Sequence, residues 1–126
     1  VICFAGDGCF QMTGQELATA CQHRLPIIVL LFNNRMFGTI RMHQEREYPK
    51  RVVGTELVNP DFVKLAEAHG ASGARVERTA EFAPVFAEAL GADRPTLIEI
   101  MIDPEAITPR QSLSQIRTAA LARQQS

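Results

Sequence analysis

Residues 6–34, GDGCFQMTGQELATACQHRLPIIVLLFNN, decide the fold of this 126-residue chain. Residues 1–5 (VICFA), which precede them, form an apolar run of strand-forming side chains that stops at Gly6-Asp7-Gly8, where glycine allows a tight turn. Residues 27–32 (IIVLLF) are apolar on both faces, as in a parallel strand that helices cover. Asn33-Asn34 ends this second run. We therefore expect two buried strands, one before this segment and one near its end.

The sequence between the two runs predicts a helix. Thr13 followed by Glu16 fits a capping box, in which side chains satisfy the free N–H groups of a helix N-terminus. Apolar residues over 17–21 then fall on one helical face, and Leu25-Pro26 ends the pattern. Strand, helix and strand together make a βαβ unit, whose crossover is nearly always right-handed.

Asp7 and Asn34 follow the carboxyl ends of the two predicted strands. Because parallel strands end at the same sheet edge, we expect these side chains to converge where open α/β sheets bind ligands. A carboxylate and a carboxamide suit Mg²⁺, which prefers oxygen ligands and keeps positions for phosphate. Gly6 and Gly8 would let phosphate approach the main chain, and the following helix would add N–H donors. All these residues are also ordinary turn formers, so a purely structural explanation stays open.

Further helices and strands are expected along the rest of the chain. Their predicted bounds are a helix over 35–44, a loop over 45–58, a helix opened by Asn59-Pro60-Asp61 and closed by Gly70, a strand over 74–76, a helix from Thr79 to Leu90 in which Pro84 fits only near the beginning, and a strand over 95–102. Glu99 is expected on the polar face of an edge strand, with a catalytic carboxylate as the alternative.

The order of these elements predicts a three-layer α/β domain with a mainly parallel sheet. We expect this domain to occupy residues 1–104, followed by a C-terminal tail over 105–126 with a short helix. The tail is expected to dock on a neighbouring subunit or domain, or to be partly disordered. Because the chain starts inside a strand and without methionine, we expect an N-terminally truncated fragment of a longer protein.

Composition excludes several classes of function. A net charge of −1 and 46% hydrophobic residues fit a soluble protein without a bias toward nucleic acid. Three cysteines at spacings unlike a zinc site favour reduced thiols and a cytoplasmic location. The longest apolar run, 26–32, is far shorter than the roughly 20 residues that span a membrane. Nucleotide-binding, serine-hydrolase and zinc-protease motifs are absent from the sequence.

The sequence GDG, followed after a gap by NN behind an apolar strand, resembles the thiamine diphosphate-binding motif of thiamine-dependent enzymes. Residues 6–34 and the following GTIRMHQ (38–44) are similar to the C-terminal diphosphate-binding domain of the acetolactate synthase-like group, and the resemblance runs to Ile116. It implies the thiamine diphosphate-binding fold, with thiamine diphosphate and Mg²⁺ as cofactors. It further implies a full-length carboligase, lyase or decarboxylase acting on 2-oxo acids.

The resemblance also implies roles for individual residues. Asp7 and Asn34 would ligate Mg²⁺ through side-chain oxygens, and the Met36 backbone carbonyl would be the third protein ligand. Phosphate oxygens and water would complete the coordination.

The remaining implied contacts concern the diphosphate and the substrate. Gly6, Gly8 and Cys9 would contact the diphosphate through main-chain groups, and Thr39 would lie near the thiazolium ring or the substrate. His43 departs from the family pattern, because acetolactate synthases have an aromatic residue at this substrate entrance. Acetolactate synthesis itself is therefore in question.

Ile40 bears on the type of reaction. Simple pyruvate decarboxylases of this superfamily have at this position a glutamate that helps to protonate the intermediate left by carbon dioxide. Isoleucine cannot donate a proton, so Ile40 favours carboligation or lyase chemistry with a second carbonyl compound over plain decarboxylation.

Catalysis in the family also requires protein that this chain does not contain. A separate pyrimidine-binding domain, usually on a partner subunit, supplies the glutamate that activates the cofactor. We therefore expect the fragment alone to be inactive and the full-length protein to be a homodimer or homotetramer that acts on a 2-oxo acid or aldehyde. The alternative is a non-catalytic homologue that serves as a structural or regulatory cofactor-binding module.

Overall fold

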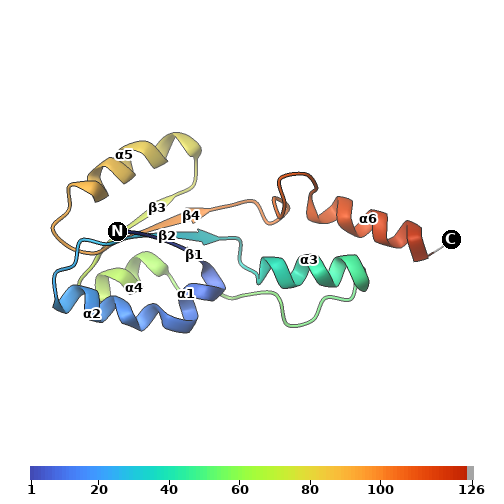
Figure 1. Ribbon diagram of the computed structural model, residues 1–126, viewed down its shortest axis with the longest axis horizontal. Coiled ribbons are helices and arrows are strands. Elements are labelled where there is room, and N and C mark those ends of the chain that lie inside the picture. Colours follow the sequence, from blue (N-terminus) through green and yellow to red (C-terminus); the bar gives the residue numbers. More distant parts are fainter. Residues whose placement is uncertain (125–126) are drawn as a thin grey trace. The chain divides into compact units, whose positions relative to one another are not determined.

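The computed structural model describes residues 1–124 and groups the chain into two compact units (Figure 1). Unit 1 contains Val1–Asn33 and Asn59–Met101, and unit 2 contains Asn34–Val58 and the residues from Ile102 onward. Each unit is therefore built from two separate stretches of sequence. The predicted domain bounds, 1–104 and 105–126, stay a prediction.

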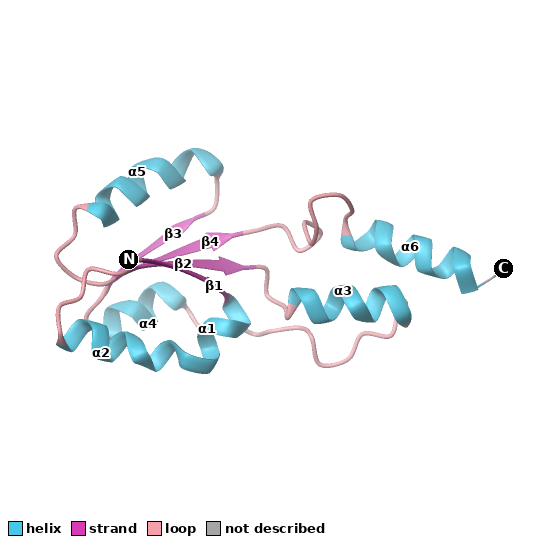
Figure 2. Cartoon of the chain, viewed as in Figure 1, coloured by secondary structure: helices cyan, strands magenta, loops and turns pink. Residues whose placement is uncertain are grey.

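Unit 1 is built on a parallel sheet of four strands, shown in magenta in Figure 2. The strands are β1 (Ile2–Gly6), β2 (Ile28–Asn33), β3 (Ser72–Val76) and β4 (Thr96–Met101), and their spatial order is β1-β2-β4-β3. Gly6 pairs with Phe32 and Asn33 with Met101, so the carboxyl ends of the first, second and fourth strands are in register. The predicted parallel α/β architecture is confirmed.

Helices cover both faces of this sheet, as Figure 1 shows. On one face lie α1 (Asp7–Thr13), the 3₁₀ turn η1 (Gly14–Glu16), α2 (Leu17–Gln22) and α4 (Phe62–Ala68), and on the other lies α5 (Thr79–Leu90). Alternate β2 residues serve the two faces, because Val29 and Leu31 pack with Phe62, while Ile28 and Leu30 pack with Ala89. The three predicted layers are therefore present.

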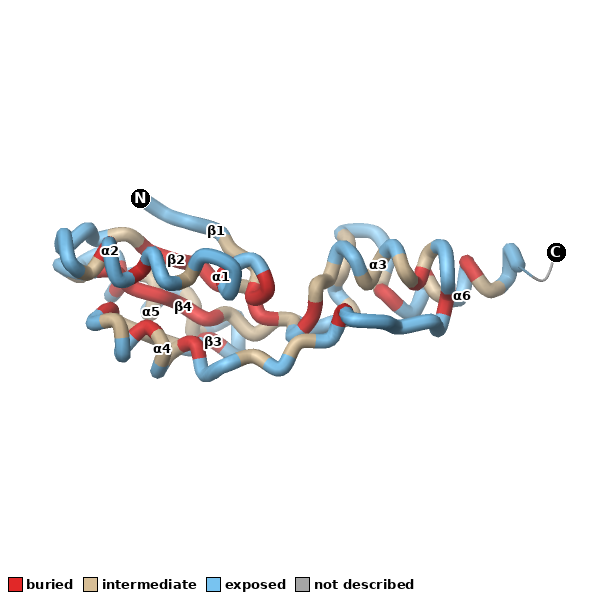
Figure 3. Tube along the Cα trace, turned by 90° about the horizontal axis from the view of Figure 1, so that it is seen from below, coloured by how far each residue is buried: buried red, intermediate tan, exposed pale blue. Residues whose placement is uncertain are grey.

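The prediction that residues 1–5 form a buried strand is wrong. Ile2 and Phe4 of β1 are 45% and 71% exposed, as the pale blue start of the tube in Figure 3 illustrates. Within residues 1–124, β1 pairs only with β2 and is an edge strand. An apolar run indicates a strand, but it does not reveal how many neighbours cover that strand.

Two predicted helix starts in unit 1 are also wrong. α1 begins at Asp7, directly after β1, and ends at Thr13. Thr13 is the N-cap of η1, but its side chain makes no capping hydrogen bond. α4 begins at Phe62, and the Asp61 side chain caps it by accepting the Lys64 N–H at 3.2 Å, so Pro60 precedes the helix. In α5, Pro84 lies in the interior and not near the beginning.

Unit 2 pairs α3 (Gly38–Glu47) with α6 (Leu113–Gln124). α3 begins later than the predicted residue 35, because Arg35 has a left-handed φ of 58° and Met36 forms a β-bridge with Glu56. It also extends to Glu47, into the predicted loop. α6 confirms the helix expected in the tail, and it packs on α3 of the same unit.

None of the helices in residues 1–124 is long and apolar enough to cross a membrane.

Candidate functional site at the strand ends

Asp7 is the first residue of α1 and follows β1 without an intervening loop. Its side chain is 2% exposed. Oδ1 accepts the Gly8 N–H at 2.9 Å, and Oδ2 accepts a hydrogen bond from Asn59 Nδ2 at 2.7 Å. Both donors are neutral, and no Lys or Arg forms an ion pair with Asp7 in the part of the chain that the structure describes. A buried carboxylate without a cationic partner is costly, so this position favours a bound cation.

Asn59 connects Asp7 to the end of β2. Its Nδ2 also donates to Asn33 Oδ1 at 2.9 Å, and its Oδ1 accepts from Gln11 Nε2 at 2.8 Å. Asn33 is 3% exposed and donates from Nδ2 to Glu99 Oε1 at 2.6 Å. One hydrogen-bonded chain therefore runs from Asp7 through two carboxamides to Glu99, all within unit 1.

The prediction that Glu99 lies on an edge strand, which followed from the alternation of residues 95–102, is wrong. β4 lies between β2 and β3, and Glu99 is 2% exposed. Arg75 Nε donates to Glu99 Oε2 at 2.7 Å, and this bond is the main cause that raises the pKa of the Arg75 guanidinium. Glu99 is thus a buried carboxylate that has its own cation, in contrast to Asp7.

The first residues of unit 2 hold the other predicted metal ligands. Asn34 Oδ1 accepts the Met36 N–H at 3.2 Å, which folds the chain into a tight turn around Arg35. The β-bridge to the loop uses the N–H of Phe37, which donates to the Thr55 carbonyl, and the carbonyl of Arg35. The Met36 carbonyl takes no part in these bridge bonds, so it is suited to ligate a metal.

Three residues predicted to line the site lie at the start of α3. Thr39, Ile40 and His43 are all exposed, with Ile40 at 56%. His43 is four residues after Thr39 and three after Ile40, a spacing that puts it near both on the helix surface. The side chains are accessible to a ligand, as a substrate-lining role requires.

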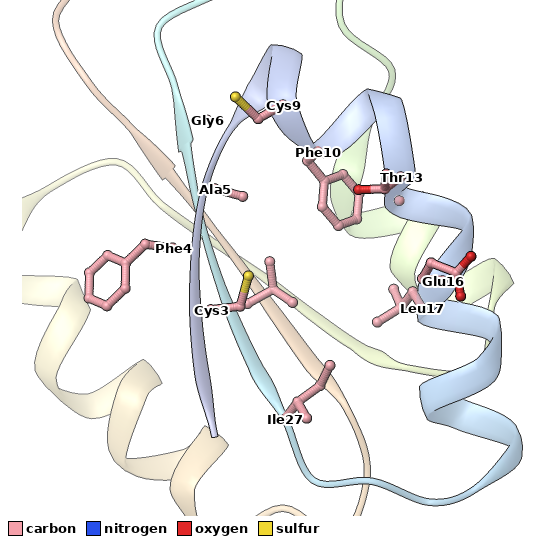
Figure 4. Close-up of a pocket in the computed structure, with 12 residues that line it drawn as sticks. Cys3, Phe4, Ala5, Gly6, Cys9, Phe10, Thr13, Glu16, Leu17 and Ile27 are labelled. Atoms are coloured by element: carbon pink, nitrogen blue, oxygen red, sulfur yellow. The ribbon is translucent and has the colours of Figure 1, made fainter.

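Gly6 directly precedes α1, and Gly8 and Cys9 lie in the first turn of this helix. Gly6 is the N-cap residue, and a Cβ added there would meet only Cys9 Sγ at 3.9 Å, so the main chain at Gly6 has room for a ligand. Beside them, a groove of about 400 Å³ runs between β1 and the helices α1 and α2 (Figure 4). Figure 4 shows Ala5 and Phe10 pointing toward the groove and Phe4 pointing away from it.

Asp7 belongs to unit 1, whereas Asn34 and Met36 belong to unit 2. Their joint binding of a metal therefore stays a prediction. No group of three or more His, Cys, Asp or Glu side chains within residues 1–124 could hold a metal ion. The predicted set contains only one side chain of those types, because its other donors are a carboxamide and a backbone carbonyl.

The contact of Asn59 with Asp7 is not predictable from the sequence. Asn-Pro-Asp is a typical helix start, so the pattern indicates only a helix N-terminus. Asn59 is 52 residues from Asp7 in the chain, and no local pattern predicts a contact over that separation.

Comparison with known proteins gives consistent matches. A family model described as "Thiamine pyrophosphate enzyme, C-terminal TPP binding domain" matches residues 1–100. The chain is 44% identical over 107 residues to an acetolactate synthase of Mycobacterium avium, covering 80% of this chain and 17% of that protein. It is 40% identical over 102 residues to the mitochondrial acetolactate synthase of Schizosaccharomyces pombe, covering 81% and 15%.

A solved structure shares the fold. The thiamine diphosphate-dependent 4-hydroxybenzoylformate decarboxylase of Rhodococcus jostii RHA1 matches with a TM-score of 0.77 and 33% identity. The match covers 82% of this chain and 20% of that one. The chain thus spans about a fifth or less of the length of the proteins that it matches.

Proposed function

The chain belongs to the family of thiamine pyrophosphate enzymes, as their C-terminal TPP-binding domain, and from this premise we propose that it binds thiamine diphosphate through Mg²⁺. The full-length protein would be a carboligase or lyase that acts on 2-oxo acids. The observation that supports the metal is the Asp7 carboxylate, which is 2% exposed and has only neutral hydrogen-bond donors among the described residues. A divalent cation would supply the missing positive charge.

The donor atoms fit Mg²⁺ and a diphosphate. A carboxylate oxygen from Asp7, a carboxamide oxygen from Asn34 and the Met36 carbonyl are hard ligands, and their small number leaves positions for phosphate oxygens and water. Asn34 Oδ1 already accepts the Met36 N–H, but a carboxamide oxygen has a second lone pair. Gly6, Gly8 and Cys9 would bind the diphosphate through main-chain groups.

When bound, thiamine diphosphate supplies the nucleophile and the electron sink that break and form bonds beside a carbonyl group. The residues of this chain anchor its diphosphate end through the metal. Thr39, Ile40 and His43, which are exposed on α3, would face the substrate. Ile40 has no proton to give, so this position would supply no proton donor, which favours ligation to a second carbonyl compound over plain decarboxylation.

This specificity for ligation rests on Ile40 and is tested by product analysis. Incubation of the full-length enzyme with 2-oxo acids, with and without an aldehyde acceptor, is expected to give mainly ligated product. The release of free aldehyde as the main product would contradict the role of Ile40. The relatives named above include acetolactate synthases and a decarboxylase.

The partners are also part of the proposal. The glutamate that activates the cofactor would come from a pyrimidine-binding domain of the same or a partner subunit in a homodimer or homotetramer. The 126-residue chain alone would then be inactive. Its cytoplasmic location stays a prediction.

Cofactor titration tests the central proposal. Full-length protein is titrated with thiamine diphosphate in the presence and absence of Mg²⁺, by isothermal titration calorimetry. We expect tight binding that needs Mg²⁺ and that is lost in Asp7→Ala and in Asn34→Ala. Asp93→Ala, which changes an exposed carboxylate far along the sequence, serves as the control and should bind normally. Binding that does not depend on Mg²⁺ would contradict the proposal.

The alternative is a non-catalytic cofactor-binding module. A protein of that kind would bind thiamine diphosphate with Mg²⁺ but give no turnover with any 2-oxo acid. Turnover assays on the full-length protein, after binding is established, separate the two functions.

A further inference from the structure

We propose that Asn59 is a positioning residue for the metal ligand Asp7, and that it connects this ligand to the Asn33–Glu99–Arg75 group at the ends of β2 and β4. The inference rests on the proposed function, because it concerns how this chain prepares its Mg²⁺ ligand. Asn59 Nδ2 lies 2.7 Å from Asp7 Oδ2 and 2.9 Å from Asn33 Oδ1. These bonds use both hydrogens of one amide group.

In each of these hydrogen bonds, the donor and the acceptor can be assigned in only one way. A carboxylate accepts hydrogen bonds and donates none, so the atom of Asn59 that faces Asp7 Oδ2 must be its amide nitrogen. At the other end, the Glu99 carboxylate requires the nitrogen of Asn33, which turns Asn33 Oδ1 toward Asn59. The two carboxylates therefore fix both carboxamides in a single orientation.

Asn59 is also held from its third side. Gln11 Nε2 donates to Asn59 Oδ1 at 2.8 Å, so all the hydrogen-bonding groups of the Asn59 carboxamide have partners within unit 1. The other end of this row of hydrogen bonds is Glu99, a buried residue that accepts a hydrogen bond from Arg75 Nε at 2.7 Å. A side chain fixed in this way cannot rotate without breaking several bonds.

The consequence concerns the Asp7 oxygens. Oδ1 is held by the Gly8 N–H and Oδ2 by Asn59, so both oxygens have a defined direction before any ligand arrives. Each oxygen has lone pairs left for a metal. Partners of this kind orient a ligand, and their removal typically lowers metal affinity by about 10- to 100-fold.

The test measures how Mg²⁺ promotes thiamine diphosphate binding to full-length protein. At a fixed thiamine diphosphate concentration, equilibrium dialysis gives the Mg²⁺ concentration at half-saturation. Asn59→Ala removes both donated bonds and is expected to raise this midpoint by about 10- to 100-fold. Asn59→Ser, whose hydroxyl is too short to reach Asp7, should act in the same direction and replaces the alanine variant if that variant does not fold.

Gln22→Ala is the matched control. It removes an exposed carboxamide of unit 1 that takes no part in this hydrogen-bonded network, so the midpoint should stay near the wild-type value. Thermal unfolding provides a second measurement. A merely structural role would lower the unfolding temperature equally with and without Mg²⁺ and thiamine diphosphate, whereas a positioning role reduces the stabilisation that the two ligands add.

The possible results separate the two proposals. If wild-type protein shows no Mg²⁺-dependent binding, the proposed function fails. If wild-type protein binds but Asn59→Ala and Asn59→Ser keep the wild-type midpoint, or if Gln22→Ala raises it as much as they do, the positioning role of Asn59 is overturned.

Discussion

Gly38 shows how closely single atoms surround a predicted metal ligand. A Cβ at this position would lie 2.8 Å from Asn34 Nδ2 and 2.8 Å from Ile107 Cδ1. Side chains do not approach so closely, so one of these groups would have to move. Because glycine has no side chain, Gly38 leaves the space that the Asn34 carboxamide occupies.

We predict that Gly38→Ala weakens Mg²⁺-dependent binding of thiamine diphosphate to the full-length protein by about tenfold, because a displaced ligand behaves like one that has lost its supporting partner. Calorimetric titration measures the change. Gly91→Ala is the control, since the nearest atom to its added Cβ, the Glu88 carbonyl oxygen, is 3.6 Å away. Equal affinities for Gly38→Ala and wild-type protein would contradict the prediction.

The sequence could predict the ligand candidates but not their surroundings. Asp7 and Asn34 were found because each directly follows a strand, and strands are visible as apolar runs. Asn59 and Arg75 contact this region only after the chain has folded back over many residues. Glu99 was assigned to an edge strand because alternation resembles half-exposed strands, whereas its burial depends on Arg75 as a partner.

At the scale of helices and strands, a buried carboxylate stabilises the contact between α3 and α6. Glu45 is 1% exposed and accepts bonds from Arg117 Nη2 at 2.8 Å and Arg41 Nη2 at 3.0 Å. The hydrogen bond from Arg117 is the main cause that lowers the pKa of Glu45 from 4.5 to about 2, with burial acting in the opposite direction. The folded state therefore favours the charged form of Glu45.

This pKa predicts how stability depends on pH. Because the folded-state pKa is below the unfolded value, the contribution of Glu45 is complete above pH 4.5 and is lost as the pH falls toward about 2. Glu45→Gln should lower the free energy of unfolding by roughly 3 kcal/mol at neutral pH, as for a broken buried ion pair. The difference from wild type should shrink in acid.

Urea unfolding of the 126-residue chain at several pH values measures this difference. Glu47→Gln, at an exposed position on the same helix, is the matched control and should change stability little. A wild-type advantage over Glu45→Gln that stays constant from neutral pH to acid would contradict the assignment.

Most helices and strands were predictable, and the errors have local causes. An apolar run located β2, alternation of apolar and polar residues located β4, and helical periodicity located α4, α5 and α6. The start of α3 was wrong because Arg35 takes a left-handed backbone conformation that arginine rarely adopts. The start of α1 was wrong because the helix begins at Asp7 without any capping side chain to signal it.

For the molecule as a whole, the chain passes between its two compact units after residues 33, 58 and 101. Unit 2 therefore needs both of its stretches, since α3 comes from one and α6 from the other. A cut at the predicted domain end, residue 104, would remove α6 together with Arg117, the partner of Glu45.

We predict that a chain of residues 1–104 keeps the sheet of unit 1 but loses the helix α3. Amide hydrogen exchange is expected to show protected β2 and β4 and fast exchange over residues 38–47. The 126-residue chain provides the reference for both regions. Continued protection of residues 38–47 in the shorter chain would mean that α3 folds without α6.

The exposed edge strand β1 has a consequence for handling the protein. An apolar strand with free N–H and C=O groups along one side is a template on which a second molecule can add a strand, and natural proteins usually protect such edges. Concentrated solutions of the 126-residue chain should therefore form β-rich aggregates, detectable by light scattering. Phe4→Lys should delay aggregation more than Val58→Lys, which adds the same charge at a fully exposed loop residue.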